Sequence, residues 1–217
     1  MNERVALVTG ASRGFGFAVA RTLGAQGWRV IALARTVGGL EELDDRIRET
    51  GGGGAATLVP LDITDDEGLA RLGRSIFDRW GRCDLLVHAA IFAAPLSPAE
   101  HVPQKDWDRM LAVNVRATQR LIANCDPLLR AADEGTAVLP TDERAGAKFF
   151  AAYGACKAAQ RAIWESWRAE TVNTGPKVRT FAPDPMPTAL RARFHPGEDR
   201  AKLAKPADEA AKLLAQL

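Results

Sequence analysis

The chain has 217 residues, enough for one α/β domain that buries most of the surface its unfolded form exposes. Lys and Arg number 29 and Asp and Glu 27, so the formal net charge of +2 gives no general field for nucleic acid or an anionic membrane. No signal-peptide pattern opens the chain, no apolar run is long enough to span a membrane, and the three cysteines are far apart. We therefore expect a single domain over residues 1–217, cytoplasmic and with reduced thiols, that binds neither metal, membrane nor nucleic acid.

Short runs rich in Val, Ile, Leu and Ala alternate along the chain with longer helical patterns. Such alternation indicates βαβ units and a parallel sheet that is covered by helices on both faces. Six strands are expected, at residues 5–8, 29–34, 55–61, 85–88, 137–139 and 177–181. The sequence therefore predicts a doubly wound α/β fold with the strand order 3-2-1-4-5-6.

One helix start stands out between the third and fourth expected strands. Residues 64–67 read Thr-Asp-Asp-Glu, the spacing of a capping box in which the Thr side chain caps the helix. Apolar residues follow at helical spacing and should face the sheet: Leu69, Leu72, Ile76 and Trp80. The four glycines at residues 51–54 are expected to form a surface loop.

A glycine-rich turn follows the first strand directly and opens a helix. It reads Thr9-Gly10-Ala11-Ser12-Arg13-Gly14-Phe15-Gly16. Glycines allow a tight turn and a close approach of backbone to a pyrophosphate, and the helix amino terminus supplies N–H groups with partial positive charge. An ordinary glycine-rich turn is the alternative, but the spacing and the position after the first strand favour a dinucleotide site of Rossmann type. The residues expected at the cofactor are Gly10, Ser12, Arg13, Gly14, Phe15 and Gly16.

The residues at the end of the second strand indicate whether NAD(H) or NADP(H) is bound. NAD-binding folds place an acid there to bind the free ribose 2′-hydroxyl, but this chain has Ala34-Arg35-Thr36. Arg35 can donate a charge-assisted hydrogen bond to a 2′-phosphate, and Arg13 can reach the same group. The alternative is that both arginines are merely solvated. The pattern favours NADP(H) over NAD(H).

The Gly-x-x-x-Gly-x-Gly turn, together with Tyr153-Gly154-Ala155-Cys156-Lys157, resembles the short-chain dehydrogenase/reductase family over essentially the whole chain. The resemblance implies that Asp62 contacts adenine and that Asn114 belongs to the active site. It implies a nicotinamide-side segment that matches Pro-Gly-x-x-x-Thr loosely, from Pro183 to Thr188, and a substrate-side lid over residues 184–205.

Tyr153 and Lys157 carry the chemistry that the resemblance implies. Residues four apart on a helix share one face, so the Lys ammonium would favour the phenolate form of Tyr153. By resemblance, Lys157 also holds the nicotinamide ribose, Tyr153 donates a proton to a carbonyl oxygen, and Asn114 orders water or backbone for a proton relay. The alternative is an ordinary pair on one helix face, which the upstream glycine turn disfavours.

The chain departs from the family pattern near the expected reaction centre. The family's Asn-Ala-Gly after the fourth strand reads Ala89-Ala90-Ile91, which removes an amide and puts a bulky side chain where glycine lets the cofactor approach. Ala89 and Ala90 remain expected cofactor contacts. The Gly of Pro-Gly is replaced by Asp184.

The family's active-site Ser is also missing. Counting from Gly135 through the fifth strand puts Asp142 at that position, whereas counting back from Tyr153 puts Pro140 there. Thr141 lies between them and is the hydroxyl that can replace the Ser as a hydrogen-bond donor. An ionised Asp142 only accepts hydrogen bonds and would repel an oxyanion, although a protonated Asp142 or a cationic substrate would change that.

Two functions are compatible with this pattern. The first is an NADPH-dependent carbonyl reductase, or the reverse alcohol dehydrogenase, with Tyr153, Lys157 and Asn114 at the site. The second is a catalytically impaired NADP(H)-binding sensor or interaction protein on the same fold. We expect a homodimer through the helices around Asn114 and Tyr153. The three histidines, His88, His101 and His195, are expected to be structural or surface residues. Trp164 and Trp167 are expected in the core or at the dimer interface, and the alternative is a substrate platform.

Overall fold

The computed structural model describes residues 3–51 and 54–217, and within them six parallel strands form one sheet in the order β3-β2-β1-β4-β5-β6. The strands are β1 (Val5–Thr9), β2 (Arg29–Ala34), β3 (Thr57–Pro60), β4 (Leu85–His88), β5 (Thr136–Pro140) and β6 (Lys177–Phe181). The predicted fold class and strand order are confirmed. Residues 52 and 53 of the expected glycine loop lie outside the described residues.

The third strand is shorter than the predicted range of residues 55–61. It lies at the sheet edge, where it pairs only with β2. Ala56 donates its backbone N–H to the carboxylate of Asp44 over 2.6 Å and not to a strand neighbour. A side chain from the preceding helix thus satisfies the backbone where the predicted strand would have begun.

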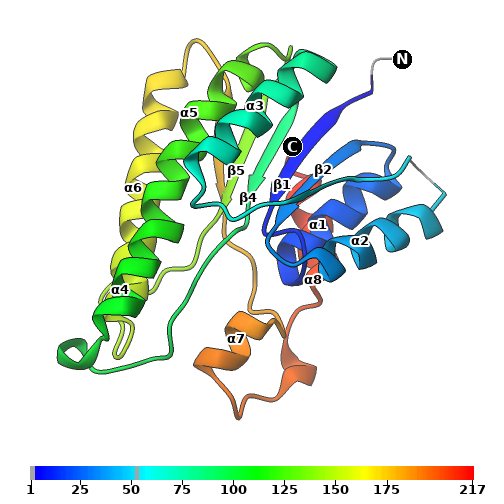
Figure 1. Ribbon diagram of the computed structural model, residues 1–217. Helices are drawn as coiled ribbons and strands as arrows, with labels where there is room; N and C mark the ends of the chain where they lie inside the picture. The colour runs from blue at the N-terminus through cyan, green and yellow to red at the C-terminus, as the bar shows by residue number, and fades with distance from the viewer. Residues whose placement is uncertain (1–2, 52–53) are drawn as a thin grey trace.

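Helices cover both faces of the sheet (Figure 1). One face carries α1 (Gly14–Ala25), α2 (Val37–Glu49) and α8 (Pro206–Leu214). The other carries α3 (Asp66–Trp80), α4 (Gln104–Met110), the π-helical segment η2 (Leu111–Arg116), α5 (Ala117–Arg130) and α6 (Ala151–Thr171). The 3₁₀ turns η1 (Ala99–His101) and η3 (Arg200–Lys202) and the short α7 (Ala189–Phe194) complete the chain. Among the described residues, none of the helices has the length and apolar character needed to cross a membrane.

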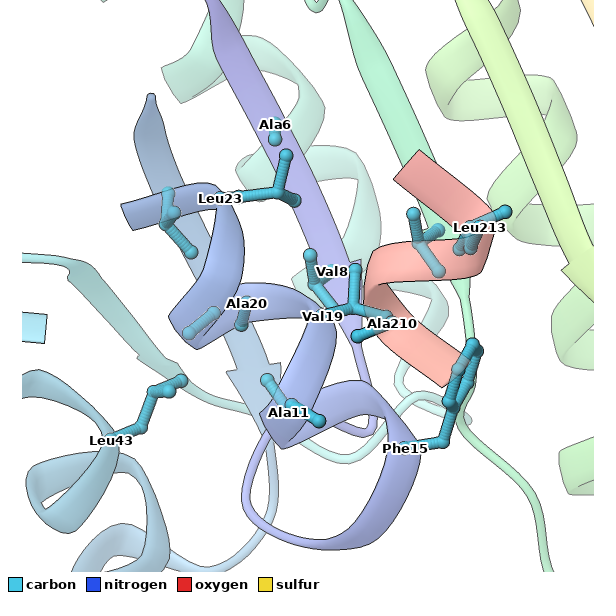
Figure 2. Close-up of a cluster of buried hydrophobic side chains, with 14 of the residues drawn as sticks. Ala6, Val8, Ala11, Phe15, Val19, Ala20, Leu23, Leu43, Ala210 and Leu213 are labelled. Carbon is cyan, nitrogen blue, oxygen red and sulfur yellow. The ribbon is translucent and has the colours of Figure 1, made fainter. Parts of the chain in front are cut away.

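Each face of the sheet has its own apolar core. Figure 2 shows the cluster on the α1 side, where Val8 of β1 and Val19 of α1 lie beside Ala210 of α8. Trp164 and Trp167 of α6 are buried in the opposite cluster. Their indole N–H groups donate to the Arg179 carbonyl over 2.9 Å and to Asp126 over 2.8 Å, so both belong to the core.

Helix α3 starts one residue later than the capping-box prediction, which was wrong in its cap. The cap is Asp65, whose carboxylate accepts the N–H of Gly68 over 2.9 Å. Thr64 does not cap because its hydroxyl donates to Asp62 over 2.8 Å. Leu69 and Ile76 are buried against the sheet, with Leu72 and Trp80 packed beside them, so the predicted apolar face is confirmed.

The parallel strands all end at the same edge of the sheet. The turns after β1, β4 and β5 therefore lie next to one another, because these strands are neighbours. Helix α7 lies beyond this edge (Figure 1). In open α/β sheets, ligands bind at the carboxyl ends of the strands, so this edge holds the candidate site.

Candidate functional site

The glycine turn packs directly against the chain that leaves β4. Gly10 has φ +69°, and a Cβ there would lie 2.8 Å from the backbone of Ala89 and Ala90. A Cβ at Gly16 would lie 2.5 Å from the Gly10 carbonyl oxygen. Both positions accept only glycine, since such contacts are far too short for a side-chain carbon.

The amino terminus of α1 is open to an anion. Arg13 occupies the cap position without a side-chain hydrogen bond, and the first turn holds no acidic residue. By contrast, α3 carries a capping Asp65 and two acids in its first turn. Free N–H groups and the helix dipole together suit a phosphate, so the turn fits a dinucleotide pyrophosphate.

Arg35 and Asp62 lie together at the ends of β2 and β3. Their guanidinium and carboxylate are 3.5 Å apart, and both side chains are nearly half exposed. Partial burial opposes ionisation of Asp62, but hydrogen bonds from Thr64 and the Arg35 charge outweigh it and lower the pKa of Asp62. Exposed pairs of this kind are worth little, so Arg35 is available to another anion.

Tyr153 lies in the first turn of α6 and is almost fully buried. Its hydroxyl donates to Oδ2 of Asp142 over 3.3 Å, and Oδ1 of Asp142 accepts from Arg144 over 3.0 Å. Thr141 points elsewhere: its hydroxyl is 3.3 Å from the backbone carbonyl of Phe181, to which it donates. Of the two residues expected to replace the Ser, the fold thus brings Asp142 next to Tyr153.

The surroundings of Tyr153 disfavour its ionisation. Burial raises the pKa of its hydroxyl, and the charge and hydrogen bond of Asp142 raise it further, against a smaller opposing effect of Arg144. A carboxylate partner stabilises the phenol, because the phenol donates a hydrogen bond and the phenolate does not.

Lys157 lies one turn after Tyr153, as the spacing predicts, with its side chain also turned inward. Its ammonium donates to the Pro140 carbonyl at the end of β5 over 3.0 Å and to Oε1 of Gln160 over 2.7 Å. Burial lowers the pKa of Lys157 to about 8, although Asp142 and Glu143 act in the opposite direction. The ammonium is thus fixed at the strand ends.

Asn114 is buried in the π-helical segment η2. Its amide donates to the Phe92 carbonyl over 2.7 Å and accepts the Phe92 N–H over 2.9 Å. The side chain therefore fixes the backbone that follows β4. Single π turns inside α-helices occur frequently at functional sites.

The segment after β6 returns to the glycine turn and to Tyr153. The γ-methyl of Thr188, which caps α7, lies 3.4 Å from the position of a Cβ on Gly14. Phe194 of α7 packs edge-on against the Tyr153 ring, with centroids 4.9 Å apart. Phe150 completes this aromatic cluster, 5.0 Å from Phe194.

Asp184 and Ile91, two residues at which the chain departs from the family pattern, each contact neighbouring residues in the fold. Asp184 forms an ion pair with Lys212 over 2.7 Å, which lowers the pKa of Asp184, and its backbone N–H donates to the buried Glu209. These bonds fasten the loop that contains Pro183 to α8. Ile91 packs with the apolar residues around Tyr153.

Two cavities of different size lie near Tyr153 and Lys157. Where Tyr153 faces the loop after β4, the described residues enclose a cavity of about 10 Å³. A larger cavity, about 260 Å³, lies between α6 and the loop after β5, and Thr141, Asp142 and Lys157 line it. The larger cavity thus reaches Asp142, the hydrogen-bond partner of the Tyr153 hydroxyl.

A comparison with known families decides what kind of protein this is. The sequence model of the short chain dehydrogenase family matches residues 4–199. The chain belongs to this family. The resemblance read from the glycine turn and from Tyr153 to Lys157 is therefore confirmed at the level of the family.

Relatives of this short chain dehydrogenase are similar over nearly its whole length. The uncharacterized oxidoreductase YciK of Escherichia coli is 31% identical over 211 residues, 96% of this chain and 83% of its own. A sorbitol dehydrogenase of Cereibacter sphaeroides is 30% identical over 187 residues, 84% of this chain and 70% of its own.

Two solved structures are similar to this short chain dehydrogenase and contain a nicotinamide dinucleotide. An Escherichia coli CFT073 protein assigned as a short chain dehydrogenase, complexed with NADPH, has a TM-score of 0.92 at 31% identity, covering 99% of this chain and 90% of its own. A Shigella flexneri protein with the same assignment, complexed with NADP, has a TM-score of 0.90 at 31% identity, covering 96% and 88%.

Sequence reasoning missed several side chains at this site. Phe150, Phe194 and Arg144 surround Tyr153, and Gln160 binds Lys157. Gln160 had a signal that was readable from the sequence, since it lies three residues after Lys157 and shares its helix face. Phe194 had none, because its contact joins segments that are far apart in the chain.

Proposed function

We propose that this short chain dehydrogenase is an NADP(H)-dependent oxidoreductase that reduces a carbonyl substrate or oxidises the corresponding alcohol. The observation that carries the proposal is a row of groups along three neighbouring strand ends. Gly10 follows β1 directly, the Ala89–Ala90 backbone lies against it after β4, and Lys157 is bonded to Pro140 at the end of β5. A dinucleotide that lies across the strand ends would meet these groups in turn, from the pyrophosphate to the nicotinamide ribose.

The residues present fit NADP(H). Gly10, Ser12, Arg13, Gly14, Phe15 and Gly16 would hold the pyrophosphate, and Asp62, Ala89, Ala90, Pro183 and Thr188 would contact the adenine and nicotinamide ends. Arg35 would bind the 2′-phosphate, exchanging its exposed partner Asp62 for a more highly charged anion. The NADP and NADPH complexes of the two similar structures support this choice of cofactor.

Bound NADPH would supply a hydride to the carbonyl carbon. Tyr153 would give its hydroxyl proton to the carbonyl oxygen, and the charge of Arg144 would favour the phenolate that remains. Lys157 would hold the nicotinamide ribose. Asn114 would keep the backbone after β4 in place through its two bonds to Phe92. Phe194 packs on the Tyr153 ring, so residues 184–205, to which it belongs, would act as a lid beside the substrate.

The contact between Tyr153 and Asp142 favours a second candidate, an NADP(H)-binding sensor or interaction protein. A carboxylate next to the proton donor would repel an oxyanion as it develops, and Thr141 faces the Phe181 carbonyl. Loss of one oxyanion donor typically costs about 10²–10³ in rate, which weakens catalysis without abolishing it. We therefore favour the enzyme.

We also propose a single domain over residues 1–217 that works in the cytoplasm as a homodimer through α5 and α6. The described cysteines are unpaired and buried, as suits a reducing compartment. Leu111 in η2 is partly exposed beside these helices and gives the dimer an apolar contact. Sedimentation with and without NADPH measures the assembly.

The test separates binding from turnover. Tryptophan fluorescence titrated with NADPH and with NADH measures cofactor affinity, and NADPH oxidation with a panel of aldehydes and ketones measures chemistry. Oxidation with at least one carbonyl compound is expected. Tight NADPH binding with no oxidation across the panel would support the sensor, and no binding at all would overturn both candidates.

A further inference from the structure

A continuous chain of buried polar side chains starts at Lys157 and crosses the core to β1. Gln160 of α6 accepts from Lys157 over 2.7 Å and donates to Thr118 of α5 over 2.9 Å. Thr118 is 2.9 Å from Nε2 of His88 on β4, and Nδ1 of His88 is 2.8 Å from the Thr9 hydroxyl on β1. All are at most 7% exposed. Buried polar groups at this density must all be paired to be tolerated.

The hydrogen-bond partners assign most of the protons in this chain. Lys157 only donates, so the Gln160 oxygen faces it and the Gln160 nitrogen donates onward to Thr118. Thr118 gives its single proton to the Asn114 carbonyl over 2.8 Å. Its oxygen must then accept from both Gln160 and His88.

Nε2 of His88 therefore carries a proton, and burial keeps the imidazole neutral, which leaves Nδ1 without one. Its bare Nδ1 accepts from Thr9, whose oxygen in turn accepts the Ala90 N–H over 3.1 Å. Burial, together with the nearby positive charge of Lys157, lowers the pKa of His88 to about 3. With a neutral His88, each bond of the chain from Lys157 to Thr9 has a defined donor and acceptor.

We propose that these polar side chains form a positioning network for Lys157. Gln160 binds the ammonium directly, and Thr118, His88 and Thr9 hold Gln160 in a fixed position relative to the glycine turn. Two acceptors within the described residues, Gln160 and the Pro140 carbonyl, fix the ammonium and leave one of its three N–H groups for a ligand. The role of that N–H toward the cofactor ribose rests on the proposed function. The positioning of the ammonium by Gln160 is independent of the proposed function.

The network explains how a cation is kept in the core. The carboxylates that face Lys157 belong to Asp142 and Glu143, in the loop after β5, and His88 on β4 is neutral. Among the residues that the structure describes, the ammonium has the Gln160 and Pro140 oxygens as its hydrogen-bond acceptors. Removal of Gln160 would leave a buried charge with half its acceptors.

The test measures the Lys157 ammonium itself. Protein carrying ¹⁵N-labelled lysine is titrated by NMR, and the Lys157 Nζ signal is assigned by its loss in Lys157→Met. The variants are Gln160→Met, which keeps the volume and removes the acceptor, and Gln160→Glu, which keeps the acceptor. Ser166→Ala, exposed on the same helix, is the matched control. A urea midpoint for each variant reports folding.

For the wild type we expect a Lys157 midpoint near 8, as burial implies. Gln160→Met should lower the midpoint by about one pH unit, because the charged form loses a bond, and this should weaken NADPH binding at pH 7 about twofold as the charged fraction falls. Gln160→Glu should raise the midpoint and restore most of the NADPH affinity. Ser166→Ala should change neither.

Two results would overturn the network. One is a Lys157 midpoint in Gln160→Met, or in Gln160→Glu if the Met variant does not fold, that equals the wild-type value. The other is a loss of urea stability with no change in the Lys157 titration, which would make Gln160 a structural residue only. A shifted midpoint in a protein that oxidises no NADPH would keep the network and reject the proposed reductase.

Discussion

The hydroxyl of Tyr153 donates a hydrogen bond to the carboxylate of Asp142 over 3.3 Å. Burial and this carboxylate both raise the pKa of Tyr153, so the residue is a phenol at neutral pH. A phenol is the form that gives a proton to a carbonyl oxygen, and a phenolate is the form that takes one from an alcohol. The pair therefore keeps Tyr153 in the form that carbonyl reduction requires.

The variant Asp142→Ser, which replaces the carboxylate acceptor by a hydroxyl donor, tests the pair of Tyr153 and Asp142. We expect Asp142→Ser to raise carbonyl reduction by up to about 10²-fold, because one donor to a developing oxyanion is worth about that much. Measured kcat/KM for NADPH oxidation with the best carbonyl substrate gives the comparison. The pH profile should also shift to lower pH, since the Tyr153 pKa falls when the negative charge leaves.

Thr141→Val is the companion variant, because the Thr141 hydroxyl donates to the Phe181 backbone. We expect turnover within a few-fold of the wild type. If Thr141→Val loses activity and Asp142→Ser does not change it, Thr141 is the substitute for the missing Ser. The effect on carbonyl reduction that we assign to Asp142 would then be rejected.

Tyr153→Phe separates chemistry from binding. The ring volume and the contacts with Phe150 and Phe194 stay, while the proton donor is lost. Turnover should fall by about 10²–10⁴-fold, the usual contribution of a general acid, with NADPH affinity little changed. Steady-state kinetics and a fluorescence titration on the same sample check both parts. Undiminished turnover would locate the chemistry at another residue.

Much of this molecule follows from local sequence signals. Strand order and the glycine turn are predictable because apolar runs and glycine spacing report on backbone near in sequence, and Lys157 follows Tyr153 by helix geometry alone. The choice between Thr141 and Asp142 was open because it depends on how the loop after β5 leaves the sheet. Only the fold shows that Thr141 continues the bonding of β5 to β6 and frees Asp142 for Tyr153.

Arg35 tests the cofactor. We expect Arg35→Ala to weaken NADPH binding by about 10- to 100-fold, the equivalent of one charge-assisted contact, and to leave NADH binding unchanged. Wild-type protein should bind NADPH more tightly than NADH by a similar factor. Fluorescence titration measures all four affinities. Arg46→Ala is the matched control, since Arg46 is an exposed arginine on α2 paired with Glu49. Equal affinities of the wild type for both cofactors would reject the assignment to NADP(H).

His88 makes stability depend on pH in a predictable direction. Its pKa is lowered to about 3 in the fold, whereas an unfolded His titrates near 6.5. Between these values the unfolded chain binds a proton that the native imidazole does not, so the free energy of unfolding rises with pH there. The stability is therefore present above about pH 6.5 and is lost toward pH 3, with a slope that approaches about 1.4 kcal/mol per pH unit.

Urea unfolding at a series of pH values between 7.5 and about 4.5 measures this slope. His88→Gln should be less stable at pH 7.5, because one amide cannot serve both Thr9 and Thr118, but its stability should depend less on pH than that of the wild type. His101→Gln, at an exposed position, is the control and should keep the wild-type slope. If His88→Gln and the wild type lose stability in parallel, the carboxylates and not His88 govern acid unfolding, and a neutral imidazole in the network would lose its support.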